Sequence, residues 1–384
     1  MTVSIEATTY YPKLLTNELN MNMRYTYLTW MNYVQKEWSI YRKRTRYASM
    51  MNKSSQILKL LNKNTISTQT VEFRLFAIMR NESLRLPYFL SYYKNLGVDR
   101  FFLIDNNSND GSAELALTYQ NVHVFQTTDS YTNHWYWTEH LLENYGKNYW
   151  CLVVDIDELF AYPFSNQIKL NKLCQYLDDK KQTAMCSLLL DMYANKEVRV
   201  VQSTQNANPL NILTYFDADY YTIPFTFLNR STQKAYSFPV FTGGMRDRIF
   251  GKSTPPALLS KVSIFKNIKG TYLSQGMHAI DGAILSELQG IVFHTKFLSD
   301  FVGEVEEECR REEHYGNAFY YKLYQQKLQK HPKLNLYHPG SVKYEGLEQL
   351  EGLGLIKSSP AYDAYVKHLI QGKSKPDETS LNHV

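Results

Sequence analysis

The chain has 384 residues, of which 44% are hydrophobic and 21% are charged, and its formal net charge at pH 7 is +5. This composition is typical of a globular protein with room for two or three domains. The longest apolar runs have the length of a strand, well below the roughly 18–20 residues that cross a bilayer. We therefore expect a cytoplasmic protein. Its four cysteines show no C-x-x-C spacing, which argues against a cysteine-bound zinc site.

The first part of the chain carries most of the positive charge. Residues 1–63 contain ten Lys or Arg and only three Glu, and residues 41–47 read YRKRTRY. Basic and aromatic side chains together suit an anionic membrane surface, so one interpretation is a helical arm, residues 1–68, at the inner face of the cytoplasmic membrane. The other interpretation is a helical extension whose aromatic residues pack on the main domain. No nucleic-acid-binding motif accompanies the patch, so we expect no nucleic acid partner.

A different pattern begins near residue 71. It predicts strands at residues 73–79, 100–104, 122–125 and 149–154, with helices between them at residues 84–96, 111–119 and 135–145. Pro87 is tolerated in the first turn of a helix, and Gly97 is a typical stop signal. Strands that alternate with helices indicate an α/β, Rossmann-like fold: a mainly parallel sheet with helices on both faces.

The pattern loosens after residue 160. We expect a helix at residues 171–181, a strand at 184–190, long loops over the sheet edge at 195–260 and one long charged helix at 299–330. The chain is therefore divided into three parts. These are a helical, basic and aromatic N-terminal extension (residues 1–70), an α/β domain (residues 71–300) and a C-terminal helical region with a tail (residues 301–384).

Two carboxylates follow the fourth predicted strand. Asp155 and Asp157 lie one residue apart, and Glu158 is next to them. In α/β sheets the ligand-binding groups collect beyond the carboxyl ends of the strands, and strand alternation places both aspartates on one side. Three such charges are costly to hold together unless a hard cation neutralises them, and oxygen ligands favour Mg²⁺ or Mn²⁺ over zinc. The alternative is a solvated turn.

Two other predicted strands also end in polar groups. Arg80, Asn81 and Glu82 follow the first strand, and residues 105–111 (DNNSNDG) follow the second. The second segment has the composition of a turn and a helix N-cap, which is its simpler explanation. Asp105, at the strand end itself, is the best placed of these residues to accept hydrogen bonds from a base or a ribose.

Taken together, these motifs resemble the glycosyltransferase family 2-like group. The likeness runs over about residues 71–330 and is carried by residues 79–82 (MRNE), 97–111, 154–158 (VDIDE), 241–250 (FTGGMRDRIF) and 292–297 (VFHTKF). Asn106 departs from the pattern, because family 2 often has a second Asp there. The resemblance implies the GT-A fold and an inverting transfer from a nucleotide-diphosphate sugar, for which we expect a UDP-sugar. It also implies that the D-x-D pair holds Mn²⁺ or Mg²⁺ against the donor diphosphate.

The resemblance implies a role for each candidate residue. The donor is expected to contact Arg80, Asn81, Glu82, Asp105, Asn107, Asp155 and Lys296. The metal ligands are expected to be Asp155, Asp157 and His294. Groups of the acceptor, or phosphates, are expected to contact Arg246, Arg248 and His278. The base that takes the proton of the acceptor hydroxyl is expected to be Asp191 or Glu158.

The expected acceptor is a hydroxyl of a cell-surface glycan or glycolipid. Two alternatives stay open. One is a non-catalytic nucleotide- or glycan-binding protein of the same fold. The other is a phosphatase of the haloacid dehalogenase type, in which Asp155 would be the nucleophile. The phosphatase fits less well, because Glu158 stands where those enzymes have Thr or Val and because three strands precede the motif.

Overall fold

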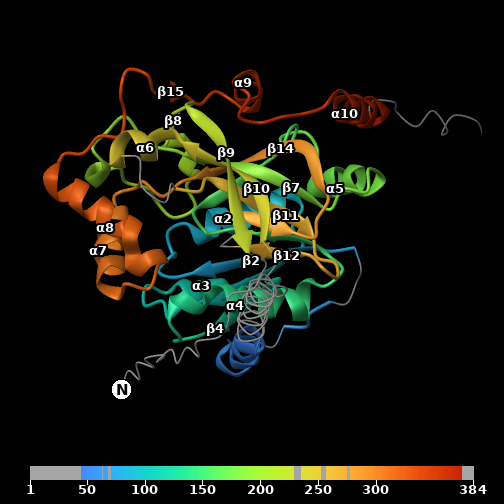
Figure 1. Ribbon diagram of the computed structural model, residues 1–384, viewed down its shortest axis with the longest axis horizontal. Helices are drawn as coiled ribbons and strands as arrows, with labels where there is room; N and C mark the ends of the chain where they lie inside the picture. Colours follow the sequence, from blue (N-terminus) through green and yellow to red (C-terminus); the bar gives the residue numbers. More distant parts are fainter. Residues whose placement is uncertain are drawn as a thin grey trace, which may run out of the picture.

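A nine-stranded mixed sheet forms the centre of the protein. It is seen in a computed structural model that describes residues 45–62, 64–67, 71–228, 235–251, 257–274 and 277–373 (Figure 1). The strand order is β1-β4-β3-β2-β5-β11-β7-β14-β6. Six strands run in one direction: β4 (Val122–Gln126), β3 (Arg100–Asp105), β2 (Phe73–Met79), β5 (Trp150–Val153), β7 (Ala184–Asp191) and β14 (Leu285–His294). The other three run against them: β1 (Lys59–Leu60), β11 (Ser260–Lys266) and β6 (Glu158–Ala161).

Both faces of the sheet are covered by helices. Because side chains alternate along a strand, Leu75 and Ala77 of β2 point into one core cluster while Phe76 points into another. The first cluster includes residues of α2 (Leu86–Leu96), α3 (Ser112–Leu117) and α5 (Leu170–Asp179), and the second includes residues of α4 (His134–Leu141). The predicted α/β class, with a mainly parallel sheet between helices, is therefore confirmed.

The first half of the sheet follows the sequence pattern closely. Strands β2 to β5 begin and end within one residue of the predicted ranges, because continuous apolar runs mark strands that are buried on both faces. Helix α2 ends at Gly97, whose φ of 112° requires the left-handed conformation that glycine adopts freely. Helix α4 continues into a π-helical turn, Leu142–Gly146, before β5.

The second half departs from the prediction of long loops. Residues 195–260 contain an antiparallel hairpin of β9 (Tyr220–Leu228) and β10 (Ala235–Gly243), followed by α6 (Gly244–Phe250). Pro224 and Pro239 lie opposite each other in this two-stranded ribbon. A proline has no backbone N–H to donate to a neighbouring strand, so a proline within a segment argues against a strand there. A two-stranded ribbon tolerates it because each strand has a free edge. Smaller pairs are formed by β8 (Tyr215–Phe216) with β15 (Val342–Lys343), and by β12 (Tyr272–Ser274) with β13 (Ala279–Asp281).

The C-terminal part is helical, as expected, but it is divided differently. The single helix predicted at residues 299–330 is two helices, α7 (Phe301–Arg311) and α8 (Tyr315–Lys330), separated at Glu312, which has a left-handed φ of 53°. Helices α9 (Leu347–Gly352) and α10 (Pro360–Lys373) follow. In the described ranges no helix combines the length and the apolar character needed to cross a bilayer.

The N-terminal segment lies partly outside the described residues, which begin at residue 45. The described portion consists of a helix over residues 45–57 and then β1, which pairs with β4 at the edge of the central sheet. Lys53 forms a 2.7 Å ion pair with Asp129. Residues 1–68 were predicted to be helical throughout, so the strand at 59–60 corrects that prediction. The described part of this segment therefore packs on the α/β domain.

Candidate active site

Asp157 and His294 face each other at the carboxyl edge of the sheet, just after β5 and at the end of β14. The imidazole Nε2 lies 3.2 Å from Asp157 Oδ2, and Nδ1 lies 2.6 Å from Asp191 Oδ1. The shorter contact assigns a ring proton to Nδ1, which donates to Asp191. Nε2 then faces a carboxylate oxygen across a gap that a second proton or a cation can fill. Although burial opposes it, the carboxylates of Asp157 and Asp191 raise the pKa of His294.

Arg246 binds Asp191, the carboxylate that also accepts a hydrogen bond from His294. Its Nε and Nη2 donate to the two oxygens of Asp191 at 2.7 and 2.9 Å, and the Asp191 side chain has no exposed surface. Although burial opposes it, Arg246 and His294 lower the pKa of Asp191 to about 2. Asp191 is thus a buried, fully engaged carboxylate that orients both His294 and Arg246.

Lys261 of β11 joins the other two acidic residues of the motif. Its Nζ lies 2.7 Å from Glu158 Oε1 and 3.3 Å from Asp155 Oδ2. The side chain of Glu158 is 2% exposed, whereas that of Asp155 is 44% exposed. Burial raises the pKa of Glu158 to about 7, although Lys261 opposes the shift. The sequence analysis missed Lys261. The available signal was a lysine in the interior of the strand SKVSIFK, whose second lysine, Lys266, stands at the strand end.

The spacing of Asp157 and His294 is compatible with two neighbouring ligands of a divalent cation. Two neighbouring ligands of Mg²⁺ or Mn²⁺, each about 2.1 Å from the ion, lie about 3 Å apart, close to the observed 3.2 Å between oxygen and nitrogen. In the described part of the chain, no three His, Cys, Asp or Glu side chains are gathered into a metal-binding group, and Asp155 is turned towards Lys261. In such sites substrate phosphates and water supply the remaining ligands. The donor set therefore fits a cation shared with a phosphate-bearing ligand.

Lys296 and Glu82 lie on the side of this pair nearest to α7. Lys296 Nζ is 3.9 Å from Asp157 Oδ2 and also donates to Glu304 of α7. Burial raises the pKa of Glu82 to about 8, against the opposing charge of Arg85. Three of the predicted site residues, Asp157, His294 and Lys296, are thus brought into one cluster by the ends of β5 and β14.

The loops after β2 and β3 form a second cluster, bonded to each other. The Asn81 amide donates to Ser108 Oγ at 3.0 Å. Asp105 is fully buried and accepts from Ser108 N at 3.2 Å and from Gln126 Nε2 at 3.1 Å. Arg80 donates to the carbonyl oxygens of Asn106 and Asn107, at 2.6 and 3.2 Å, and to Glu307 of α7 at 2.8 Å. Helix α7 therefore covers the edge at which the sequence predicts nucleoside binding.

Arg248 has different partners from the other candidates. It donates to both oxygens of Asp217 at 2.7 and 2.9 Å and to the Leu336 carbonyl at 2.7 Å. Arg246, two residues earlier on α6, bonds Asp191 in the same two-oxygen manner. The structure thus brings Arg246, and not Arg248, to His294.

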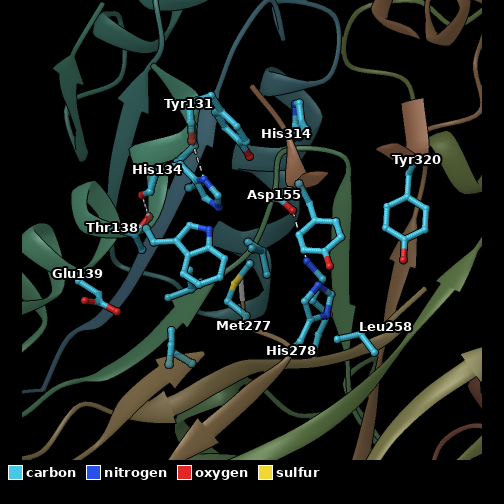
Figure 2. Close-up of a pocket in the computed structure, with 18 of the residues that line it drawn as sticks. Tyr131, His134, Thr138, Glu139, Asp155, Leu258, Met277, His278, His314 and Tyr320 are labelled. Atoms are coloured by element: carbon cyan, nitrogen blue, oxygen red, sulfur yellow. Dashed lines mark hydrogen bonds and ion pairs between the residues drawn. The ribbon is translucent and has the colours of Figure 1, made fainter. Parts of the chain in front are cut away.

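A cavity of about 390 Å³ opens beside Asp155 (Figure 2). Its charged and polar lining includes Arg246, Lys261 and His278. The His278 Nδ1 donates to the Ser260 carbonyl at 2.8 Å, and burial, with the charge of Lys261, lowers the pKa of His278 to about 3. His278 is therefore neutral, and its Nε2 is an acceptor. The remaining lining is rich in rings that the sequence analysis did not single out: Tyr131, His134, Trp135, Phe225, His314, Tyr315 and Tyr320.

The fold and the site together define a class: an α/β protein whose sheet carries a buried Asp–His pair, basic side chains and an aromatic cavity at its carboxyl edge. No family model matches the chain, and no curated protein matches it. Among solved structures it is similar to a UDP-glucose pyrophosphorylase from Acinetobacter baumanii, at 9% identity and a TM-score of 0.26, over 67% of this chain and 99% of that chain. So weak a likeness carries no argument, and a function has to be inferred from the residues themselves.

Proposed function

We propose that this protein is a metal-dependent glycosyltransferase. In this proposal it moves a sugar from a nucleotide-diphosphate sugar, a UDP-sugar as the first candidate, to a hydroxyl of a cell-surface glycan or glycolipid with inversion. The observation that carries the proposal is the Asp157–His294 pair, held by Asp191 at the carboxyl edge of the sheet, 3.2 Å apart. Support comes also from the motif resemblance over about residues 71–330.

On the donor side, Asp157 and His294 would hold Mn²⁺ or Mg²⁺. When bound, such an ion acts as a Lewis acid that stabilises the departing nucleoside diphosphate. Asp155, two residues before Asp157, would contribute to the same region. Lys296 adds a positive charge 3.9 Å from Asp157, which favours a diphosphate oxygen there. Asp191 accepts the Nδ1 proton of His294, so Nε2, once it has released its own proton, would be the nitrogen that holds the ion.

The loops after β2 and β3 are proposed to face the nucleoside of the donor. Arg80, Asn81, Glu82, Asp105 and Asn107 come from these two loops, which are bonded to each other and to α7. Because Arg80 is already paired with Glu307 of α7, binding there would have to exchange that ion pair for a contact with the donor.

On the acceptor side, the aromatic cavity beside Asp155 is the proposed binding place. The neutral His278 can accept a hydrogen bond from an acceptor hydroxyl through Nε2, and Arg246 supplies a fixed positive charge. Asp191 and Glu158, the two expected bases, have side chains that are 0% and 2% exposed and engaged in ion pairs. We therefore assign both of them to positioning: Asp191 holds His294 and Arg246, and Glu158 holds Lys261.

The test is a screen for release of nucleoside diphosphate from UDP-, GDP- and dTDP-sugars in the presence of Mn²⁺. We expect release from one nucleotide class that is lost with a chelator and in Asp157→Ala. It should be retained in Asp178→Ala, which alters an exposed aspartate paired with Lys266. Release of phosphate from a phosphate monoester, without any sugar donor, would favour the phosphatase. Metal-independent nucleotide binding that is unchanged in Asp157→Ala would favour a non-catalytic binding protein.

A further inference from the structure

A larger cleft, of about 1010 Å³, lies on the other face of the sheet. Its walls come from α2, from the 3₁₀ turn Pro209–Asn211 and from the segment that leads from β15 into α9. Its apolar lining residues, such as Leu96, Phe293 and Leu347, belong to or pack on the first core cluster. The apolar residues that line the cavity beside Asp155, such as Leu142 and Phe225, belong to or pack on the second. Ala77, Val154 and Ala257 of the first cluster also line the cavity beside Asp155, but the two recesses share no lining residue.

The described polar lining of the cleft carries no positive charge, and several of its side chains make no hydrogen bond within the described ranges. Hydroxyl and amide side chains at the cleft have no hydrogen-bond partner within the described part of the chain: Ser91, Asn95, Ser165, Asn166 and Asn211. Among the described lining residues there is no Lys, Arg or His, and the only charged ones are Glu345 and Glu348. A phosphate, a nucleotide or an acidic polymer would find no cation here, so these ligand classes are excluded.

Tyrosine rings give the cleft rigid aromatic walls. Tyr88 and Tyr92, one turn apart on α2, are both half-buried with ring centroids 6.2 Å apart. The Tyr92 hydroxyl donates to the Phe160 carbonyl at 2.8 Å, which fixes that ring. On the opposite wall Tyr344 packs edge-on against Phe293. Rings held in this way lose little conformational entropy when a ligand covers them.

We propose that this cleft is a binding site for a neutral oligosaccharide. Sugar rings present C–H faces that pack on aromatic rings and hydroxyls that bond to amides and hydroxyls, and the cleft supplies both kinds of surface. Its volume exceeds that of the cavity beside Asp155, which suits several linked sugar units. The proposal does not depend on the transferase activity, because no residue of the cleft belongs to the candidate active site.

The test uses the full-length protein with maltohexaose, cellohexaose and chitohexaose as probes, observed by saturation-transfer-difference NMR. We expect at least one hexaose to bind with a Kd of the order of 1 mM. Tyr88→Ala should weaken that binding about two- to tenfold, since an aromatic contact contributes about 0.5–1.5 kcal/mol. Asn95→Ala combined with Asn211→Ala, two exposed positions that should not disturb folding, should weaken it as well. Tyr119→Ala is the matched control, because this half-buried tyrosine at the end of α3 lines neither recess.

Three results would overturn the proposal. The first is that no neutral hexaose binds the wild-type protein. The second is that the Tyr88 and asparagine variants bind as tightly as the wild type. The third is that Tyr119→Ala weakens binding as much as Tyr88→Ala, which would mean that the sugar adheres to the surface in general. Binding of UDP with Mn²⁺, measured in parallel, should be unchanged in Tyr88→Ala, so failure of the cleft and failure of the proposed transferase are told apart.

Discussion

Replacing Asp191 by Asn tests whether the Asp157–His294 pair is a cation site. Asp191 accepts from His294 Nδ1 at 2.6 Å, and this bond directs Nε2 towards Asp157. Loss of such an outer partner lowers metal affinity about 10- to 100-fold in known sites, which corresponds to about 1.4–2.8 kcal/mol. We therefore expect Asp191→Asn to bind Mn²⁺ about 10- to 100-fold more weakly, measured by calorimetric titration in the presence of UDP.

The protein offers a matched control for this variant. Asp217 accepts from Arg248 with the same two-oxygen geometry, at 2.7 and 2.9 Å, and its side chain is 7% exposed. Each substitution replaces a buried carboxylate that binds an arginine through both of its oxygens, so both variants should lose stability. Only Asp191→Asn should lose Mn²⁺ affinity. If Asp191→Asn remains folded and binds Mn²⁺ like the wild type, or if Asp217→Asn loses affinity equally, the inferred support of His294 by Asp191 is wrong.

Three further predictions concern stability and surface binding. Lys261→Met should lower the free energy of unfolding, by about 3 kcal/mol at most, because the buried Glu158 loses its counter-charge and has to take up a proton. Adding Glu158→Gln should recover part of that loss in denaturant titrations followed by tryptophan fluorescence, and an additive double variant would contradict the pairing. Burial, with the charge of Arg100, lowers the pKa of His123 to about 4. As the pH falls from 6.5 to 4, His123 therefore takes up a proton in the unfolded chain before it does so in the folded protein. The free energy of unfolding of the wild type should fall in that window by about 1–2 kcal/mol more than that of His123→Gln. Equal losses in the two proteins would refute this. Removing residues 1–44 should abolish salt-sensitive binding to anionic vesicles while leaving nucleoside diphosphate release intact, and undiminished vesicle binding would place the membrane contact elsewhere.

The parts of the fold that could be predicted are those where each residue has one dominant role. The apolar runs of β2 and β5 mark strands buried on both faces, and their ends located the polar groups at the carboxyl edge of the sheet. The hairpin of β9 and β10 could not be predicted in this way. Pro224 and Pro239 argue against strands, and only the pairing between the two segments shows that they lie at tolerated positions.

In the candidate site, only those residues could be predicted whose role shows in their own position along the sequence. Asp157 and His294 stand out because polar residues end apolar strands. Lys261 was missed, since its meaning depends on Glu158, which lies 2.7 Å away in space and about a hundred residues earlier in the chain. The burial of Asp191 and the ion pair between Arg248 and Asp217 likewise depend on tertiary packing, which cannot be read from the local sequence.

The position of β11 between β5 and β7 has a consequence for how the protein is made. Strands β4, β3, β2 and β5 are all encoded before residue 154 and can pair while the chain is still growing. β7 cannot join them until β11, which ends at Lys266, has left the ribosome and entered between β5 and β7. A half-sheet that pairs during translation would keep an open β5 edge for more than a hundred residues of synthesis. That edge is where a chaperone would have most to protect, and its closure by β11 also brings Lys261 to the acidic motif.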